Sequence, residues 1–262
     1  MLTFLRRIRR SLFGTGSTGK YLLYAIGEIA LVVMGILIAL RINNWNEERK
    51  EAEVERQYMV GLLSDLAKDR DQLLNNVEFG LIPVMYNDSL FSELQKKPLR
   101  GREKKIYHFY LLYTNAIRIS YHDRTISQLK NSGGFGLIKS QGVSDAILDY
   151  DVYMRESMEF SEGSRSNHHV NNDILLNSRM YEIYRIEHLK DSAIAHKDVM
   201  NKVAYPEDLR LLSYDDADIK IILNSMSKVR TVDQYNYHRA VEALEINRKL
   251  DSLIRNEYLD KE

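Results

Sequence analysis

The most constraining feature of this 262-residue chain is an apolar stretch at residues 21–40, with the sequence YLLYAIGEIALVVMGILIAL. Its only charged residue is Glu28. As a helix, a stretch of about 20 residues spans the roughly 30 Å hydrocarbon core of a bilayer, whereas a core helix in a soluble protein would show a polar face. The stretch is also too long for a typical signal peptide, and no small-residue cleavage site follows it. We therefore expect a transmembrane helix.

Basic residues flank this stretch unevenly. Residues 1–20 carry five bases and no acid, namely Arg6, Arg7, Arg9, Arg10 and Lys20, whereas residues 41–55 carry three bases among five acids. Because cytoplasmic flanks carry the excess of Lys and Arg, we expect the N-terminus in the cytoplasm and the C-terminal part on the other side of the membrane.

The first 13 residues place apolar side chains on one helical face and arginines on the other. Such a helix can lie on an anionic leaflet, and Arg6, Arg7, Arg9 and Arg10 would then contact the lipid surface. The alternative is that these arginines only set the topology.

Residues 14–20, GTGSTGK, match the glycine-rich phosphate loop up to its lysine. Tyr21 stands where a Ser or Thr hydroxyl would contact magnesium, and no strand precedes the glycines. A flexible elbow between two helices explains these glycines better, so we expect no nucleotide here and no cofactor elsewhere.

Glu28 lies within the predicted span, where an ionisable residue indicates function or packing. It shares a helical face with Tyr24, Val32, Gly35 and Ala39. The small residues Gly35 and Ala39 let a second helix approach closely. We therefore expect this face to contact a partner helix, either in another copy of the chain or in a different membrane protein. The alternative is that Glu28 lies shallow enough to reach the interface.

Beyond the span, apolar residues recur at helical spacing. The pattern predicts helices over residues 41–79, 88–97, 102–119, 125–131, 141–184 and 215–258. Gly80 and Pro83 mark a break, and the run from Ser132 to Gly134 marks a helix end, because glycine accepts the left-handed cap conformation.

These elements predict a mainly α fold: an N-terminal transmembrane helix that continues into a long helix, followed by an extracytoplasmic antiparallel helical bundle. The expected parts are a basic cytoplasmic tail at 1–20, the transmembrane helix at 21–42 and an extracytoplasmic helical domain at 43–262.

No catalytic motif accompanies this organisation. The chain has no cysteine, its seven histidines are scattered, and we interpret Asp65, Asp69 and Asp71 as solvated charges. We expect no enzyme activity and no metal site. The 37 acidic and 37 basic residues balance, and the chain after residue 20 is mildly acidic, so we expect no nucleic-acid partner.

Three segments resemble a family of bacterial single-pass membrane proteins that forms a domain family of unknown function. They are TGKYLLYAIGEIALVVMGILIALRINNWNEERK, YMVGLLSDLAKD and TISQLKNSGGFGLIKSQGVSDAILDYD. The resemblance implies a bacterial cell-envelope protein of the inner membrane, with its C-terminal domain in the periplasm, and it implies no activity.

The sequence thus favours a membrane-anchored interaction or scaffold protein that binds lipid and assembles through its membrane helix. Two other classes stay open. One is the small subunit of a proton-driven membrane complex, with Glu28 as proton carrier. The other is a ligand-sensing envelope domain whose signal a partner protein would receive.

Overall fold

The computed structural model describes residues 18–113, 117–176, 209–211 and 213–259, without the side chains of residues 164–176 and of a few other positions. The chain divides into two compact units, Met1–Gln57 and Tyr58–Glu262. Helix α2, Thr18–Phe79, begins in the first unit and ends in the second. All described elements are helical, with no strand among them, which confirms the mainly α prediction.

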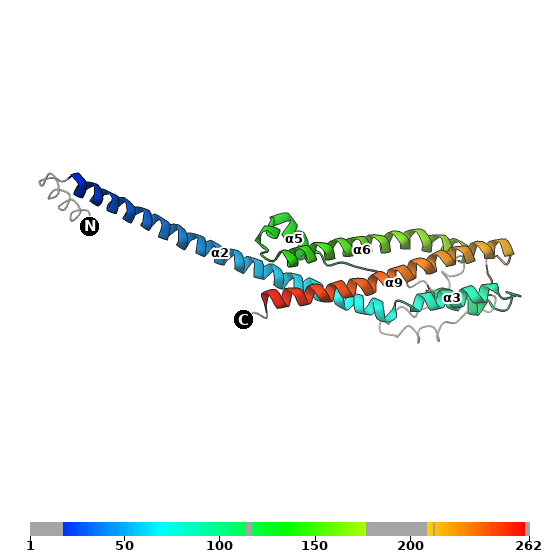
Figure 1. Cartoon of the computed structure of the whole chain (residues 1–262). Coiled ribbons are helices and arrows are strands. Elements are labelled where there is room, and N and C mark those ends of the chain that lie inside the picture. Colours follow the sequence, from blue (N-terminus) through cyan, green and yellow to red (C-terminus); the bar gives the residue numbers. More distant parts are fainter. Residues whose placement is uncertain (1–17, 114–116, 177–208, 212, 260–262) are drawn as a thin grey trace. The chain divides into compact units, whose positions relative to one another are not determined.

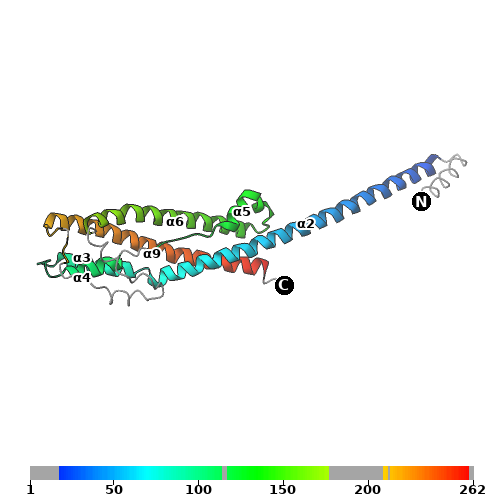
Figure 2. The same cartoon turned by 180° about the vertical axis from the view of Figure 1, so that it is seen from behind.

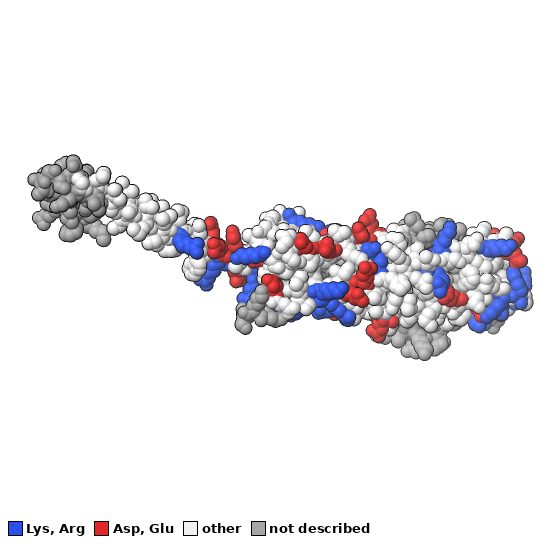
Figure 3. Space-filling view, in the orientation of Figure 1, with Lys and Arg blue, Asp and Glu red and all other residues white. Residues whose placement is uncertain are grey.

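In the first unit, α2 presents large apolar side chains to the surroundings. Twelve of them between Leu22 and Ile42 are exposed, from 46% for Val33 to 72% for Leu31. Figure 3 shows almost no charged atoms on the visible face of this segment. By length and composition this part of α2 can cross a membrane, and no other described helix meets that criterion.

The second unit is a helical bundle (Figures 1 and 2). After α2 it contains α3 (Ile82–Gln95), α4 (Glu103–Tyr113), α5 (Arg124–Ser132), the short 3₁₀ helix η1 (Gly134–Leu137), α6 (Gln141–Leu176) and α9 (Asp216–Tyr258). Helices α6 and α9 lie side by side and run in opposite directions. The α2–α3 edge also runs opposite to α9, because Leu66 pairs with Asn247 late in α9 and Asn87 pairs with Met226 early in it.

Each long helix buries one stripe of residues, spaced alternately three and four apart. In α9 the stripe is Ile219, Ile222, Met226, Val229, Asp233, Asn236, Ala240, Ala243, Asn247, Leu250 and Ile254. In α2 it is Met59, Leu62, Leu66, Asp69, Leu73 and Asn76, and in α6 it is Val143, Ile147, Tyr150, Met154, Ser157 and Ser161. This spacing keeps one face toward neighbouring helices, as in coiled coils. The bundle is therefore held by three such stripes, each interrupted by polar residues.

Helix α9 contributes to two separate apolar clusters. Its C-terminal half packs with α2, α5 and α6 around Leu66, Leu129 and Ile147. Its N-terminal half packs with α3 and α4 around Leu90, Tyr107 and Tyr110, all three of which are buried. Helix α9 thus connects the two halves of the unit.

Most of the predicted helices are confirmed, with shifted ends. The predicted helix at 215–258 is α9, and Asp215 caps it by accepting from the Ala217 N–H at 2.8 Å. Helix α3 begins at Ile82 rather than at 88, because Pro83 fits the first turn of a helix. The left-handed cap after α5 is confirmed at Gly133, with φ of 72°. Helix α6 continues through Gly163 to Leu176, and residues 177–184 of the predicted helix lie outside the described residues.

The prediction of a helix over 102–119 is wrong at its C-terminal end. Helix α4 ends at Tyr113, and residues 117–122 are extended, whereas Asp123, with φ of −92° and ψ of 11°, already turns into α5. In this segment Ile117 and Ile119 are buried, whereas Arg118 and Ser120 between them are exposed. Such alternation has the period of two that an extended chain requires. It follows directly on a helical pattern, and the predicted helix was therefore too long.

Asp233, on the buried stripe of α9, yields a test of this core. It is 2% exposed, and its Oδ2 has no hydrogen-bond partner among the described residues. Burial raises the pKa of Asp233 from 3.8 to about 7. A raised carboxyl pKa means that the folded state prefers the neutral acid, so the contribution of Asp233 to stability is most favourable at low pH and falls as the pH rises from about 4 to about 7.

We therefore expect Asp233→Asn to match the native protein near pH 4 and to exceed its stability by on the order of 3 kcal/mol at pH 8. Urea unfolding followed by circular dichroism measures this difference, with Glu245→Gln as an exposed control on the same helix. An equal difference in stability between Asp233→Asn and the native protein at both pH values would contradict the raised pKa of Asp233.

Candidate functional site

Four polar side chains of α2 bind the extended segment at residues 117–122 and the start of α5. They are Asp65, Asp69, Gln72 and Asn76, and we call them the polar ladder. Along the ladder, Asp65 contacts Thr125, Asp69 contacts His122, Gln72 contacts Ser120 and Arg118, and Asn76 contacts Arg118. The segment therefore runs antiparallel to α2.

The ladder supplies hydrogen-bond partners to the backbone of the extended segment. Buried backbone N–H and C=O groups need partners, and residues 117–122 belong to no helix, whereas the Asp123 carbonyl already accepts from the Ser127 N–H of α5. Gln72 accepts from the Ser120 N–H at 3.2 Å and from its hydroxyl at 2.8 Å, and it donates to the Arg118 carbonyl. Asn76 donates to the same carbonyl at 3.0 Å. The side chains of a helix thus replace the neighbouring strand of a sheet.

Asp65 holds the N-terminus of α5. Its Oδ2 accepts from the Thr125 N–H at 3.0 Å and from the Thr125 hydroxyl at 2.6 Å. Burial by itself would raise the pKa of Asp65, but the hydrogen bonds from Thr125 and the neighbouring Lys68 ammonium outweigh burial and lower it. A carboxylate at a helix N-terminus is further favoured by the free N–H groups of the first turn. Asp65 is therefore an ionised cap supplied by another helix.

Asp69 is fully buried at the centre of a polar layer. It accepts from the His122 N–H at 2.9 Å and from the Tyr150 hydroxyl at 2.9 Å, and His122 Nδ1 lies 2.8 Å from its Oδ1. Asn247 on α9 donates to the Tyr150 hydroxyl and to the Leu66 carbonyl, both at 3.0 Å. Burial raises the pKa of Asp69, and the hydrogen bonds from His122 and Tyr150 oppose this rise only in part. The layer links α2, α6 and α9 to the extended segment.

A second carboxylate, Asp151 on α6, continues the polar network. It accepts from the Tyr121 hydroxyl at 2.8 Å and from Arg155 Nε at 3.0 Å, and it also pairs with Lys130. Burial would raise the pKa of Asp151, but Lys130, Arg155 and Tyr121 together lower it. Arg155 also reaches Asp123 at 2.6 Å. Both ends of α5 are thereby attached to α6.

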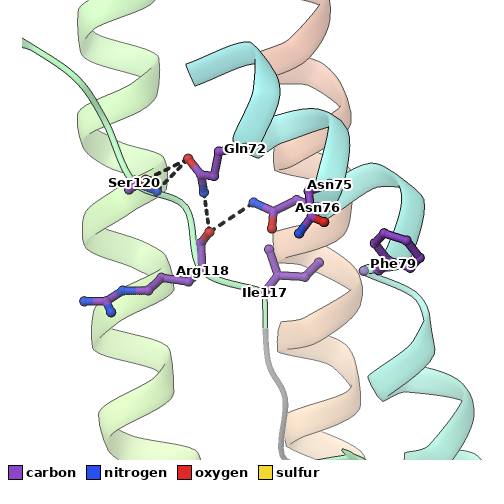
Figure 4. Close-up of a pocket in the computed structure, with 8 residues that line it drawn as sticks. Gln72, Asn75, Asn76, Phe79, Ile117, Arg118 and Ser120 are labelled. Carbon is purple, nitrogen blue, oxygen red and sulfur yellow. Dashed lines mark hydrogen bonds between the residues drawn. The ribbon is translucent and has the colours of Figure 1, made fainter. Parts of the chain in front are cut away.

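A pocket of about 380 Å³ lies at the last rungs of the ladder (Figure 4). Its lining is Gln72, Asn75, Asn76, Phe79, Gly80, Ile117, Arg118 and Ser120. Two of its amides, Gln72 and Asn76, already bind the extended segment. The Arg118 side chain points away from these amides, and its guanidinium lies 3.8 Å from Glu162. Gln72 and Asn76 thus use polar atoms to bind Arg118 and Ser120, which themselves line the pocket.

The chemistry available to the ladder is limited by these contacts. His122 beside Asp69 has the geometry of an oriented imidazole, which many general bases share. The nearby hydroxyls of Ser120 and Thr125 both donate to ladder side chains and are therefore engaged as donors. Within the part of the chain that the structure describes, no group of three or more His, Asp or Glu side chains is arranged to hold a metal. The described hydrogen bonds of the ladder all join parts of the chain to one another.

The residues that sequence analysis singled out lie apart from this site. Glu28, Val32, Gly35 and Ala39 are exposed on α2 in the first unit, and a Cβ on Gly35 would meet no described atom within 4 Å beyond its chain neighbours and the nearby backbone of its own helix. Helical spacing places them on one face, and their role stays a prediction. The side chain of Tyr24 and the whole of Arg6, Arg7, Arg9 and Arg10 lie outside the described residues, as does most of the glycine-rich run at 14–20.

The interpretation of Asp65 and Asp69 as solvated charges is wrong. They are 4% and 0% exposed, and only Asp71 of the three faces solvent. A signal for this was present in the sequence, because Asp69 and Asn76 continue the three-and-four spacing of Leu62, Leu66 and Leu73. A polar residue on an apolar stripe indicates a buried hydrogen-bonded group.

The family comparison agrees with the resemblance seen in the sequence. Residues 28–94 match DUF6090, a family of unknown function. This match begins within the apolar part of α2 and ends in α3, so it includes the whole ladder. No curated protein and no solved structure matches the chain. The family match assigns no activity to the ladder or to the pocket.

The ladder predicts a specific loss on substitution of its first rung. Asp65→Asn removes the negative charge of the carboxylate that accepts two hydrogen bonds from Thr125. We expect it to lower the free energy of unfolding by about 1–3 kcal/mol at neutral pH. Because the folded-state pKa of Asp65 is lowered, its contribution is present above the ordinary pKa of 3.8 and is lost as the pH falls through the folded value.

Asp71→Asn is the matched control, because Asp71 lies on the same helix and is exposed. Its effect should stay within about 0.5 kcal/mol. Urea unfolding of the full chain in detergent micelles compares the two variants. Equal effects would show that Asp65 has no special structural role.

Proposed function

We propose that this protein is anchored in a membrane by the apolar part of α2 and serves there as a helical interaction or scaffold protein. The observation that carries the proposal is the exposure of the twelve apolar side chains between Leu22 and Ile42. Burying a large apolar side chain gains about 1.5–3 kcal/mol. Water does not offer that gain, whereas a hydrocarbon core covers all sides of such a helix.

The proposed location is the inner membrane of a bacterium. Five bases and no acids in residues 1–20 favour a cytoplasmic N-terminus, and the bundle of the second unit then lies in the periplasm. The resemblance to bacterial single-pass membrane proteins supports the same location. In this setting Arg6, Arg7, Arg9 and Arg10 would contact anionic headgroups.

The proposed assembly surface is the face of α2 with Glu28, Gly35 and Ala39. A single helix cannot shield Glu28 from lipid. A second helix that packs on the small residues Gly35 and Ala39 would cover Glu28 with its own side chains. The space beside Gly35 is compatible with this contact, because no described atom beyond its own helix lies near it. The occupant is a second copy of the chain or another membrane protein.

The bundle is better suited to presenting a surface than to a reaction. Its most polar region, the ladder, is occupied by its own hydrogen bonds. Its described pocket has three amide side chains in its lining, and two of them, Gln72 and Asn76, bind the extended segment. These two features support a scaffold over an enzyme.

Ala39→Leu tests the anchor and its face together. The larger side chain would push a partner helix away from Gly35. We therefore expect cross-linking between α2 and its partner helix, measured for the full chain in membranes, to fall at least about tenfold. Alkaline washing should leave both the native protein and the variant in the membrane pellet.

Ala30→Leu is the matched control. It makes the same change on the opposite face of the same helix, about 200° around the axis from Glu28, and should leave cross-linking unchanged. Release of the native protein by alkaline washing would contradict the anchor. An equal effect of both substitutions would contradict the assembly face.

A further inference from the structure

The connection between α3 and α4 concentrates positive charge. Residues 96–105, KKPLRGREKK, contain six bases and one acid in a chain whose charges balance overall. The six bases are Lys96, Lys97, Arg100, Arg102, Lys104 and Lys105. Figure 3 shows blue side chains gathered at this end of the second unit.

Three of these cations share one buried carboxylate. Glu93, on α3, is 3% exposed. Its Oε1 lies 2.8 Å from Lys96 Nζ and 3.0 Å from Lys105 Nζ, and its Oε2 pairs with Arg102. A buried carboxylate needs such partners to offset its lost hydration. Glu93 therefore holds three cations in fixed positions while neutralising one charge.

The other cations extend this group toward the start of α9. Lys97 pairs with Asp216, and the Arg100 guanidinium lies 4.5 Å from the centre of the Tyr214 ring. Glu103 is engaged, because it accepts from the Tyr214 hydroxyl at 2.6 Å and from the Gly101 N–H at 2.7 Å. Lys104 is exposed on the first turn of α4.

The cations thus form a strip from α4, across the α3–α4 connection, to the start of α9. We call it the basic strip. Four of its six cations pair with the carboxylates of Glu93 and Asp216, and Arg100 has a favourable charge interaction with Glu103. The excess positive charge is held in place by hydrogen bonds and ion pairs, so binding an anion would order few additional side chains.

We propose that the basic strip is a docking surface for a linear polyanion with phosphate groups spaced along its chain. Such a polymer can place successive phosphates beside the cations around Glu93 and beside Lys97 and Arg100 near the start of α9. Binding of this kind releases counterions and weakens steeply with salt. The proposal concerns the second unit alone and goes beyond the proposed anchor and assembly face.

The test uses the full chain in nanodiscs of uncharged lipid, with long-chain inorganic polyphosphate as the labelled probe and fluorescence anisotropy as the readout. We expect saturable binding that weakens at least about tenfold between about 50 mM and about 200 mM salt. The double variant Lys96→Gln/Lys105→Gln should bind about tenfold more weakly, with a shallower salt dependence. It leaves Arg102 on Glu93, so the buried carboxylate keeps a partner.

Lys104→Gln is a second variant for the case in which the double variant does not fold. Lys104 is exposed, so its replacement should weaken binding by a smaller factor and leave the circular dichroism spectrum unchanged. The matched control is Lys228→Gln/Lys249→Gln, which removes the same charge from exposed positions of α9 and should leave binding unchanged.

Three results would overturn the proposal. The first is absence of saturable binding to polyphosphate. The second is an equal loss in the strip variant and in the α9 control, which would reflect overall charge only. The third is association that requires anionic lipid in the nanodiscs, which would assign the strip to a lipid surface.

Discussion

Hydrogen bonds from the side chains of one helix to the backbone of an extended segment organise half of the bundle. Residues 117–122 have the alternating burial of a strand but no strand beside them. Asp69, Gln72 and Asn76 of α2 supply the partners that such a backbone requires, and Asp65 caps the helix that follows. Without these contacts the segment would leave polar groups unpaired, at about 1–3 kcal/mol for each buried group.

The position of α5 and its neighbours follows from this attachment. Asp65 fixes the start of α5, and Gly133 ends it in a left-handed conformation that glycine adopts without strain. Lys130 and Arg155 then join α5 and the residue before it to Asp151 of α6. Polar contacts thus connect α2 to α5 and α5 to α6. The layer of Asp69, Tyr150 and Asn247 connects α2 and α6 to α9. A shift of any one helix would break several of these contacts together.

Regular features of this fold could be predicted from sequence, because they depend on local residues. The period of α9, its cap at Asp215 and the glycine end of α5 are each encoded within a few neighbouring positions. The extended segment was missed because α4 leads into it without a strong breaker, so its alternation was hidden at the end of a helical pattern. Asp65 and Asp69 were misread because their partners, Thr125, His122 and Tyr150, lie far away in the sequence. The membrane face of Glu28, Gly35 and Ala39 stays a prediction, since its proposed partner is a second helix.

The proposed scaffold function is consistent with how the bundle uses its polar groups. The buried carboxylates of Asp69 and Asp151 hold helices together, whereas six bases are concentrated at the α3–α4 connection. The polar ladder is most directly tested by residue-resolved hydrogen exchange of the full chain. The amides of Ser120, His122 and Thr125 should exchange slowly, as in a paired strand, and Asp69→Asn should speed exchange at His122. Exchange of these three amides at the rate of an unstructured peptide would contradict the ladder.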